Sequence, residues 1–297
     1  MKVSDIKLWT ALITPFNNSG DVDLTSYKNL INLQISAGIK GLLLFGSTGE
    51  AATLSTDEME ELAAVTKTLK KDSLVMMGVT HNNTAIAVEK VKQACAWGAD
   101  VLLVAPPYYN KPSSEGMRRH FIEISKAAGS LPIVLYNIPA RVGVTMDLDL
   151  IRELSRLDNV IGIKEASENL LLASQLYEDG QLSVWSGDDS LLLPFMSVGA
   201  LGGISVSSNL FPSEFLSMVN AFSSGDNKKA TRLSSAFSQW YPKVFAESNP
   251  IGIKAAMSIK GLIENELRMP LCPMSAQHAA QVNSFLSSFT LSCAEEA

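Results

Sequence analysis

The feature that most constrains the fold is a pattern that the chain repeats eight times. In each repeat, a short apolar run rich in β-branched residues is followed by a segment whose apolar residues have helical spacing, as expected of a strand and then a helix. Eight such units match the size and rhythm of an α/β fold of the (β/α)8 TIM-barrel type, whereas a doubly wound sheet usually stops at about five or six strands. The predicted strands are LWTALIT (8–14), GLLLFG (41–46), SLVMMGV (73–79), ADVLLVA (99–105), PIVLYN (132–137), VIGIK (160–164), LSVWSG (182–187) and GGISVS (202–207).

The segments outside these strands read as helices. Ser55 and Glu58 form an S-x-x-E capping box before one of them. After residue 225 the strand signal stops, and no low-complexity tract interrupts the chain, so we predict a catalytic barrel at 1–225 and a three-helix C-terminal appendage at 226–297 that packs on it. The clearest barrel helices are 24–38, 56–71, 84–98 and 147–157, and those of the appendage are 227–245, 251–267 and 275–289.

The composition excludes several classes of function. Of the 297 residues, 46% are hydrophobic and 18% are charged, which is ordinary for a globular protein with a large core. A formal net charge of −6 and the lack of any basic run argue against a nucleic-acid partner. The first residues lack the apolar core of a signal peptide, and no stretch approaches the ~18 apolar residues of a membrane span. We therefore expect a cytoplasmic protein without membrane contact.

Cysteine and histidine do not indicate a metal or cofactor site. The three cysteines are far apart and lack CxxC spacing, which argues against both a disulfide framework and a zinc site. The three histidines are equally scattered and carry no argument for a metal ligand or a catalytic base. We predict no metal and no cofactor. The cysteines are Cys95, Cys272 and Cys293, and the histidines are His81, His120 and His278.

Chemically interesting residues cluster where the predicted strands end. Enzymes with this barrel build their active sites from the loops that follow the strands, so such clustering predicts the place of the site. The strand ends carry Thr14-Pro15, Gly46-Ser47-Thr48-Gly49-Glu50, Pro106-Pro107-Tyr108-Tyr109-Asn110, Tyr136-Asn137 with Arg141 beyond, Lys164, and Gly187-Asp188-Asp189.

Lys164 ends an apolar run that otherwise looks like a buried strand. Strand alternation places Lys164 with Gly162 on one face and Glu165 on the other, so Glu165 is no ion-pair partner for an inward-pointing lysine. Burial without a counter-charge lowers a lysine pKa by up to ~3–5 units, which would leave a neutral amine near pH 7. Such an amine is suited to forming a Schiff base with a carbonyl substrate. The alternatives are a lysine that reaches solvent at the barrel mouth or one paired with an acid from another strand.

An imine mechanism also needs proton donors and a group that holds a carboxylate. Tyr136, Tyr109 and Thr48 supply hydroxyls at the strand ends and could relay protons. The GSTGE loop (46–50) offers small residues, hydroxyls and backbone N–H groups near a helix, which suits an anion, although it could be only a tight turn.

Several blocks together resemble the dihydrodipicolinate synthase (4-hydroxy-tetrahydrodipicolinate synthase) family, from Thr14-Pro15 to Arg268-Met269-Pro270. GSTGE and the lysine block are shared with the wider superfamily of pyruvate-dependent class I aldolases and N-acetylneuraminate lyases, whereas PYYN with YNIPAR is more specific. The matching blocks are GSTGEAATLS (46–55), PPYYNKPS (106–113), YNIPARVG (136–143), IGIKEAS (161–167), SGDDS (186–190), GGISVSSN (202–209) and NPIGIKAAM (249–257).

The resemblance implies a lyase in which Lys164 forms an imine with pyruvate and the derived enamine attacks L-aspartate semialdehyde. Tyr136 would be the proton donor and acceptor, and Thr48 would relay protons between Tyr136 and Tyr109. The family donates the tyrosine at the Tyr109 position from a neighbouring subunit, which implies a homodimer or homotetramer. Substrate-binding roles fall to Ser47 and Thr48 for the pyruvate carboxylate, Arg141 for the semialdehyde carboxylate, and Gly187 and Ile204 for backbone contacts.

This chain departs from the family pattern in two ways. Ser47 stands where many synthases have threonine, and serine there is common in N-acetylneuraminate lyase relatives. In lysine-inhibited members, polar or acidic side chains line an interface site, of which only Asn82 and Tyr108 match here. With no carboxylate at Ile86 to pair with lysine, we predict weak or absent feedback inhibition. The other unmatched positions are Ala51, Thr56 and Met59.

Three other functions compete with this interpretation. A lyase that cleaves a sugar acid or a hydroxy-keto acid would share the imine chemistry, but that group typically lacks the arginine at Arg141. A metal-dependent aldolase could use Asp188 and Asp189 for Mg²⁺, although these aspartates also suit loop hydrogen bonds or helix capping. A non-catalytic binding paralogue is disfavoured because the chain keeps the lysine, both tyrosines, the threonine and the arginine.

Overall fold

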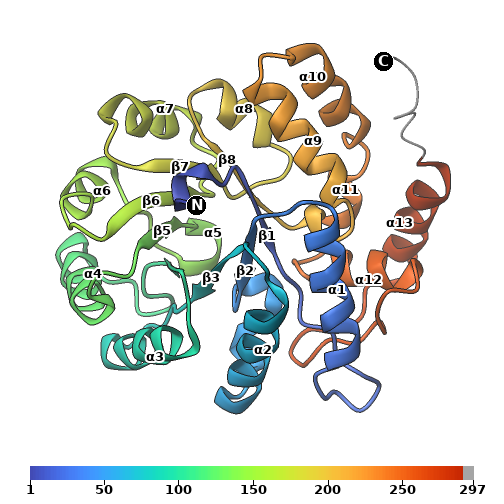
Figure 1. Ribbon diagram of the computed structural model, residues 1–297, viewed down its shortest axis with the longest axis horizontal. Helices are drawn as coiled ribbons and strands as arrows, with labels where there is room; N and C mark the ends of the chain where they lie inside the picture. The colour runs from blue at the N-terminus through green and yellow to red at the C-terminus, as the bar shows by residue number, and fades with distance from the viewer. Residues whose placement is uncertain (290–297) are drawn as a thin grey trace.

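The predicted barrel is confirmed. In residues 1–289, which the computed structural model describes, eight parallel strands close into a barrel, each pairing with the next along the chain and β8 with β1 (Figure 1). Cys293 and the end of the predicted appendage lie outside the described residues. The strands are β1 (Leu8–Ala11), β2 (Gly41–Leu44), β3 (Leu74–Gly78), β4 (Val101–Val104), β5 (Ile133–Asn137), β6 (Val160–Glu165), β7 (Ser183–Ser186) and β8 (Gly202–Ser205).

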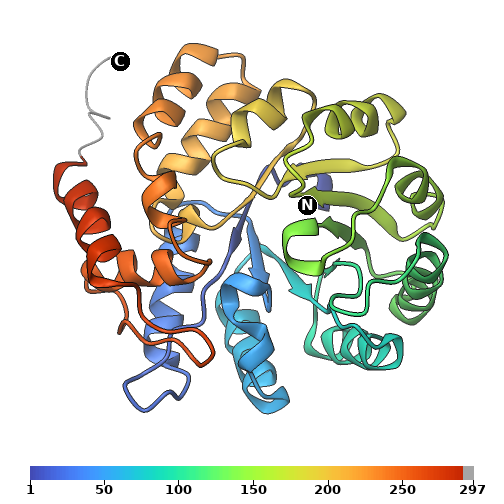
Figure 2. The same ribbon diagram turned by 180° about the vertical axis from the view of Figure 1, so that it is seen from behind.

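Helices surround the barrel on the outside, as Figures 1 and 2 show. The predicted capping box starts α2: the Glu58 amide donates to Ser55 Oγ at 3.2 Å, and the Ser55 amide donates to Glu58 Oε2 at 2.8 Å. Within the described part of the chain, no helix has the length and apolar character needed to cross a membrane. The barrel helices are α1 (Leu24–Ser36), α2 (Thr56–Leu69), α3 (Thr84–Trp97), α4 (Ser114–Ala128), α5 (Pro139–Val142), α6 (Leu148–Leu154), α7 (Leu170–Asp179), α8 (Leu192–Ser197) and α9 (Pro212–Ser223).

The C-terminal part is helical, but its helices are shorter than predicted. The segment 227–245 divides into α10 (Asn227–Ala236) and α11 (Tyr241–Val244), because Pro242 lacks an N–H and fits only in the first turn of a helix. The next helix, α12 (Ile251–Ile259), stops before Gly261, whose φ of 71° is left-handed. The last helix is α13 (Ala276–Ser288).

These C-terminal helices pack on the barrel, as the sequence predicts. Helix α10 contacts α8 and α9, and α12 contacts α11 and α13. Figures 1 and 2 both show α12 and α13 on the side of the barrel where α1 lies, and the Arg268 side chain donates to Gly20 O there at 2.9 Å. The division at residue 225 itself stays a prediction.

Side-chain alternation along the strands produces two apolar layers. One cluster fills the barrel and includes Trp9, Met76 and Trp185, while the larger cluster lies between strands and helices. Because large side chains fill the interior, the barrel is a packed core and not a pore. A substrate site must therefore lie at one end.

Candidate active site

Lys164 points into the barrel. It pairs in register with Tyr136 on β5 and Trp185 on β7, and residues in register share a face of the sheet. Glu165 lies on the opposite face, where its carboxylate accepts from Asn137 Nδ2 at 2.9 Å and from the Ser167 amide at 2.6 Å. The predicted alternation is confirmed, and Glu165 is no partner for the lysine.

The surroundings of Lys164 disfavour its charge. Only 5% of the residue is exposed, which disfavours the charge, while the face of the Tyr136 ring, whose centroid lies 4.4 Å from Nζ, stabilises it in part. Among the described residues, no carboxylate lies within 4.0 Å of this amine. Gly187 leaves room for it, since a Cβ there would lie 3.1 Å from Lys164 Cε.

Burial lowers the pKa of Lys164 to about 8, with Asp189 opposing the shift and Arg141 adding to it. The amine is therefore easily deprotonated, but roughly one tenth of it is neutral at pH 7. The sequence predicted that burial lowers the pKa of this lysine, and the direction is confirmed, with a smaller shift than a neutral amine at pH 7 requires. The counter-charge on Asp189, which strand alternation cannot reveal, limits the shift.

The pH dependence of the reaction follows from this pKa. Only the neutral amine attacks a carbonyl, so we expect kcat/KM for a carbonyl substrate to rise about tenfold per pH unit below pH ~8 and to level off above it. Initial rates measured from about pH 6 to pH 9.5 test this expectation. A profile that is flat over this range, or one that still rises at its upper limit, would contradict it.

Tyr136 is a buried phenol beside the lysine. Burial raises its pKa above its usual range, with Arg141 opposing the shift, so the hydroxyl stays protonated and can donate. Tyr136, Ser47 and Arg141 line one cavity of about 540 Å³ at the carboxyl end of the strands. Tyr108 lines this cavity as well.

The GSTGE loop forms a tight 3₁₀ turn at Ser47–Gly49. The Gly49 and Glu50 amides donate to Gly46 O and Ser47 O, each at 3.1 Å, so the amides of Ser47 and Thr48 remain at the open start of the turn. Thr48 is buried, and its Oγ1 accepts from Asn249 Nδ2 at 2.8 Å. Ser47 is more exposed and lines the cavity, whereas Thr48 does not.

Two predicted residues are brought into place and one is not. Ile204 is buried inside the barrel in the same apolar cluster as Tyr136. Gly187 lies next to the Lys164 side chain. Tyr109 is 86% exposed with a left-handed φ of 74°, and it does not line the cavity. This chain alone therefore does not place Tyr109 beside Tyr136.

The two aspartates after β7 form loop hydrogen bonds. Asp188 accepts from the Ser190 and Leu191 amides at 2.7 and 3.2 Å. Asp189 accepts from the Val206 and Ser207 amides at 3.3 and 2.7 Å, which ties the β7 loop to the end of β8. These contacts are the loop hydrogen bonds that were expected from the sequence as one role for the two aspartates.

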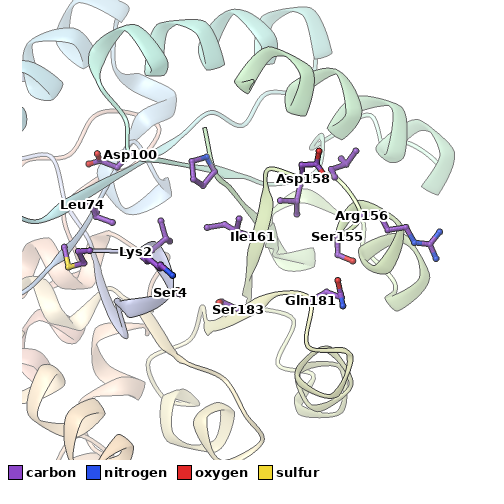
Figure 3. A pocket seen from close by; sticks show the side chains of 15 residues that line it. Lys2, Ser4, Leu74, Asp100, Ser155, Arg156, Asp158, Ile161, Gln181 and Ser183 are labelled. Atoms are coloured by element: carbon purple, nitrogen blue, oxygen red, sulfur yellow. The ribbon is translucent and has the colours of Figure 1, made fainter. Parts of the chain in front are cut away.

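A larger cavity lies at the opposite end of the barrel. It measures about 880 Å³ and is formed where strands begin, with Ile161 and Ser183 at the starts of β6 and β7 (Figure 3). None of the predicted site residues lines it, and its charged side chains come from Lys2, Asp100, Arg156 and Asp158. Since barrel enzymes place chemistry at the carboxyl end of the strands, the smaller cavity is the candidate active site.

Sequence reasoning missed the C-terminal residues that support the GSTGE loop. Lys254, on α12, is fully buried and forms an ion pair with Glu50 at 2.6 Å. Asn249, just before α12, contacts both Thr48 and Arg141. A lysine within the apolar run IGIKAAM was the available signal, since it resembles the lysine within VIGIK.

Known proteins resemble this chain along most of its length. A curated 4-hydroxy-tetrahydrodipicolinate synthase from Methanococcoides burtonii is 43% identical over 90% of this chain and 92% of its own. The solved synthase of Methylacidiphilum fumariolicum SolV is 39% identical, covers 95% of both chains and superposes with a TM-score of 0.91. A structure described as a monomeric dihydrodipicolinate synthase variant is 35% identical, covers 95% of this chain and 96% of its own, and has a TM-score of 0.91.

The family assignment follows from these similarities and from a family model. The model of the dihydrodipicolinate synthetase family matches residues 5–289, which include the whole barrel and the C-terminal helices. Lys164, Tyr136, Ser47, Thr48 and Arg141 all lie within the matched range. This chain belongs to the dihydrodipicolinate synthetase family.

Proposed function

We propose that this chain is a 4-hydroxy-tetrahydrodipicolinate synthase, which condenses pyruvate with L-aspartate semialdehyde by class I aldolase chemistry. The observation that carries the proposal is Lys164: it is buried, has no carboxylate within ion-pair distance among the described residues, and lies against Tyr136. Its lowered pKa makes it a usable nucleophile near neutral pH. Relatives that bear the synthase name match over nearly the whole chain.

The proposed reaction starts at the lysine amine. Lys164 Nζ attacks the carbonyl carbon of pyruvate, and loss of water from the carbinolamine gives an imine. Loss of a methyl proton converts the imine to an enamine, whose carbon attacks the aldehyde carbon of the semialdehyde. The amino group of the adduct then attacks the imine carbon, which closes the ring and releases the lysine.

Tyr136 is the proposed proton donor and acceptor in these steps. Its phenol is protonated and lies beside Lys164, as the loss of water from the carbinolamine requires. Thr48 is the proposed relay hydroxyl, and Ser47 is a second candidate because it lines the cavity with Tyr136. Comparison of Thr48→Val with Ser47→Ala would show which hydroxyl the proton-transfer steps need.

The remaining site residues bind substrate in this proposal. Ser47 and Thr48 would hold the pyruvate carboxylate at the open amides of the turn, with backbone contacts from Gly187 and Ile204. Arg141 lines the cavity and would hold the carboxylate of the semialdehyde.

We also propose that the complete site needs a second copy of the chain. Tyr109 is exposed and left-handed, an arrangement suited to reaching across a subunit interface into a partner's site. The dimer or tetramer is tested by sedimentation, with Tyr109→Phe assayed for activity. The monomeric relative makes this test informative, because its fold is the same. The cytoplasmic location stays a prediction from the sequence.

The test of the function has two parts. NADPH oxidation is followed with pyruvate, L-aspartate semialdehyde and a coupling reductase, and borohydride trapping of pyruvate is read by intact mass. Turnover with both substrates is the expected result. A pyruvate adduct on Lys164 without turnover would favour cleavage of a sugar acid or a hydroxy-keto acid, and no adduct would contradict the imine mechanism.

L-lysine is expected to be a weak inhibitor or none at all. Ala51 and Ile86 line the cavity, and the described residues of its lining include no Asp or Glu that could pair with lysine's ammonium groups. Lys90 and Arg141 line it instead, and their positive charges would repel the ammonium groups. Steady-state assays with added L-lysine test this, with Ile86→Glu as the variant expected to gain sensitivity. Inhibition of the unaltered enzyme at micromolar L-lysine would contradict the prediction.

A further inference from the structure

Asn249 links two parts of the proposed site. Its Nδ2 donates to Thr48 Oγ1 at 2.8 Å, and its backbone carbonyl accepts from Arg141 Nη2 at 2.9 Å. Thr48 follows β2 and Arg141 lies in α5, so a single residue before α12 contacts two loops of the barrel mouth. None of the site residues predicted from the sequence comes from this C-terminal part.

The direction of the bond to Thr48 determines what its hydroxyl can do. A hydroxyl has one hydrogen to donate and two lone pairs to accept. Because Asn249 donates, the hydrogen of Thr48 is left for another acceptor. In this orientation Nδ2 is paired, while Oδ1 is buried and has no partner among the described residues.

A buried ion pair holds the two segments together beside this bond. Glu50 lies two residues after Thr48 in a left-handed conformation with φ of 52°, which is unfavourable for a residue with a Cβ. Its carboxylate accepts from Lys254 Nζ at 2.6 Å and from the Arg268 amide at 3.0 Å. Lys254 lies five residues after Asn249, so the loop and the start of α12 are joined at two points. Asn249 is thereby held at a fixed place relative to Thr48.

We propose that Asn249 is a positioning residue that directs the Thr48 hydroxyl hydrogen toward bound pyruvate or its imine. The inference rests on the proposed function, because it assigns a task to Thr48 in the pyruvate half of that reaction. Asn249 itself touches no reacting atom in this account. Its backbone contact with Arg141 is a separate task that side-chain substitutions leave in place.

The experiment isolates the pyruvate half-reaction. Imine formation is read by borohydride trapping and intact mass, and enamine formation by exchange of the pyruvate methyl protons with deuterium in D₂O, followed by NMR. Neither readout uses the second substrate. The variants are Asn249→Ala, Asn249→Asp, Thr48→Val and the double variant Asn249→Ala/Thr48→Val, with Asn220→Asp, at an exposed asparagine on α9, as the matched control.

The two Asn249 substitutions are expected to differ. Asn249→Ala removes one hydrogen bond and should slow proton exchange by about 3- to 10-fold. Asn249→Asp has nearly the same shape but can only accept at this position, so it should capture the Thr48 hydrogen and slow exchange by roughly 100-fold. In the coupled assay with both substrates, KM for the aldehyde should stay unchanged in Asn249→Ala, since the carbonyl that contacts Arg141 is retained.

The double variant separates positioning from general damage to the fold. If Asn249 acts through Thr48, adding Asn249→Ala to Thr48→Val should change the exchange rate by less than about twofold. The same loss in both backgrounds, or an Asn249→Asp enzyme that exchanges like the unaltered one, would overturn the inference while leaving the function intact. Absence of any pyruvate adduct in the unaltered enzyme would instead refute the proposed function and the inference with it.

Discussion

Lys164→Met is expected to abolish the pyruvate adduct and to stabilise the fold at the same time. Without the amine no imine forms, so turnover should fall by at least about 10³-fold. Stability should rise because the folded protein disfavours the charged lysine: its pKa falls from 10.5 to about 8. At ~1.36 kcal/mol per unit, the protonated side chain destabilises the folded state by about 3 kcal/mol, which the neutral methionine avoids.

The destabilisation caused by charged Lys164 depends on pH. Below pH ~8 the lysine is protonated in both the folded and the unfolded chain, and the destabilisation is fully present. Between about pH 8 and pH 10.5 only the unfolded chain binds the proton, so the stability of the unaltered protein rises toward that of the variant. Urea unfolding at both ends of this range measures the difference. Lys28→Met, at an exposed lysine on α1, is the control that should change neither activity nor this pH dependence.

A Lys164→Met protein that unfolds at a lower urea concentration than the unaltered protein at pH 7 would contradict the stability prediction. A variant that still accumulates a borohydride-stable pyruvate adduct would contradict the catalytic one. The two readouts are independent, so the role of Lys164 in chemistry and the energetic effect of its burial are tested separately.

Lys254→Met is expected to have the opposite effect on stability. Both Lys254 and Glu50 are fully buried, and removal of the lysine leaves the Glu50 carboxylate without its counter-charge. Breaking a buried ion pair in this way typically costs about 3–5 kcal/mol. The loop that carries Thr48 should also lose its position, so activity should fall with stability.

The double variant Glu50→Gln/Lys254→Met tests the cause. It removes both charges, while the glutamine oxygen can still accept from the Arg268 amide as Glu50 does. Replacement of a buried pair by neutral groups is often close to neutral, so most of the lost stability should return. Urea unfolding of Glu50→Gln, Lys254→Met and the double variant gives the coupling energy. If the losses of the single variants simply add, the ion pair is not the source of the destabilisation.

The contrast between the two buried lysines shows what the sequence could reveal. Both follow apolar residues, in VIGIK and IGIK, and neither local pattern distinguishes them. The difference is a partner: Glu50, about two hundred residues earlier, neutralises Lys254, while Asp189 remains beyond ion-pair distance from Lys164. The structure therefore assigns one lysine to stability and leaves the other available for chemistry.

The barrel, its strand order and the inward direction of Lys164 followed from the sequence by itself. Strand alternation has a period of two and helices have a period of 3.6, and both are local properties of the chain. Parallel strands joined by helices bring their carboxyl ends to one edge, which is why Tyr136, Arg141 and the GSTGE loop could be expected together.

Contacts between remote segments were decided only by the tertiary structure. Asn249 meets Thr48, Lys254 meets Glu50, and the loop of Asp189 meets the end of β8, although no periodicity or motif relates these positions. Each contact depends on how the C-terminal helices and the loops pack in three dimensions. Hydrogen bonds and ion pairs act over a few ångströms in space, whatever the distance along the chain. The sequence therefore indicated the candidate reacting residues, while the packing determined which residues contact them.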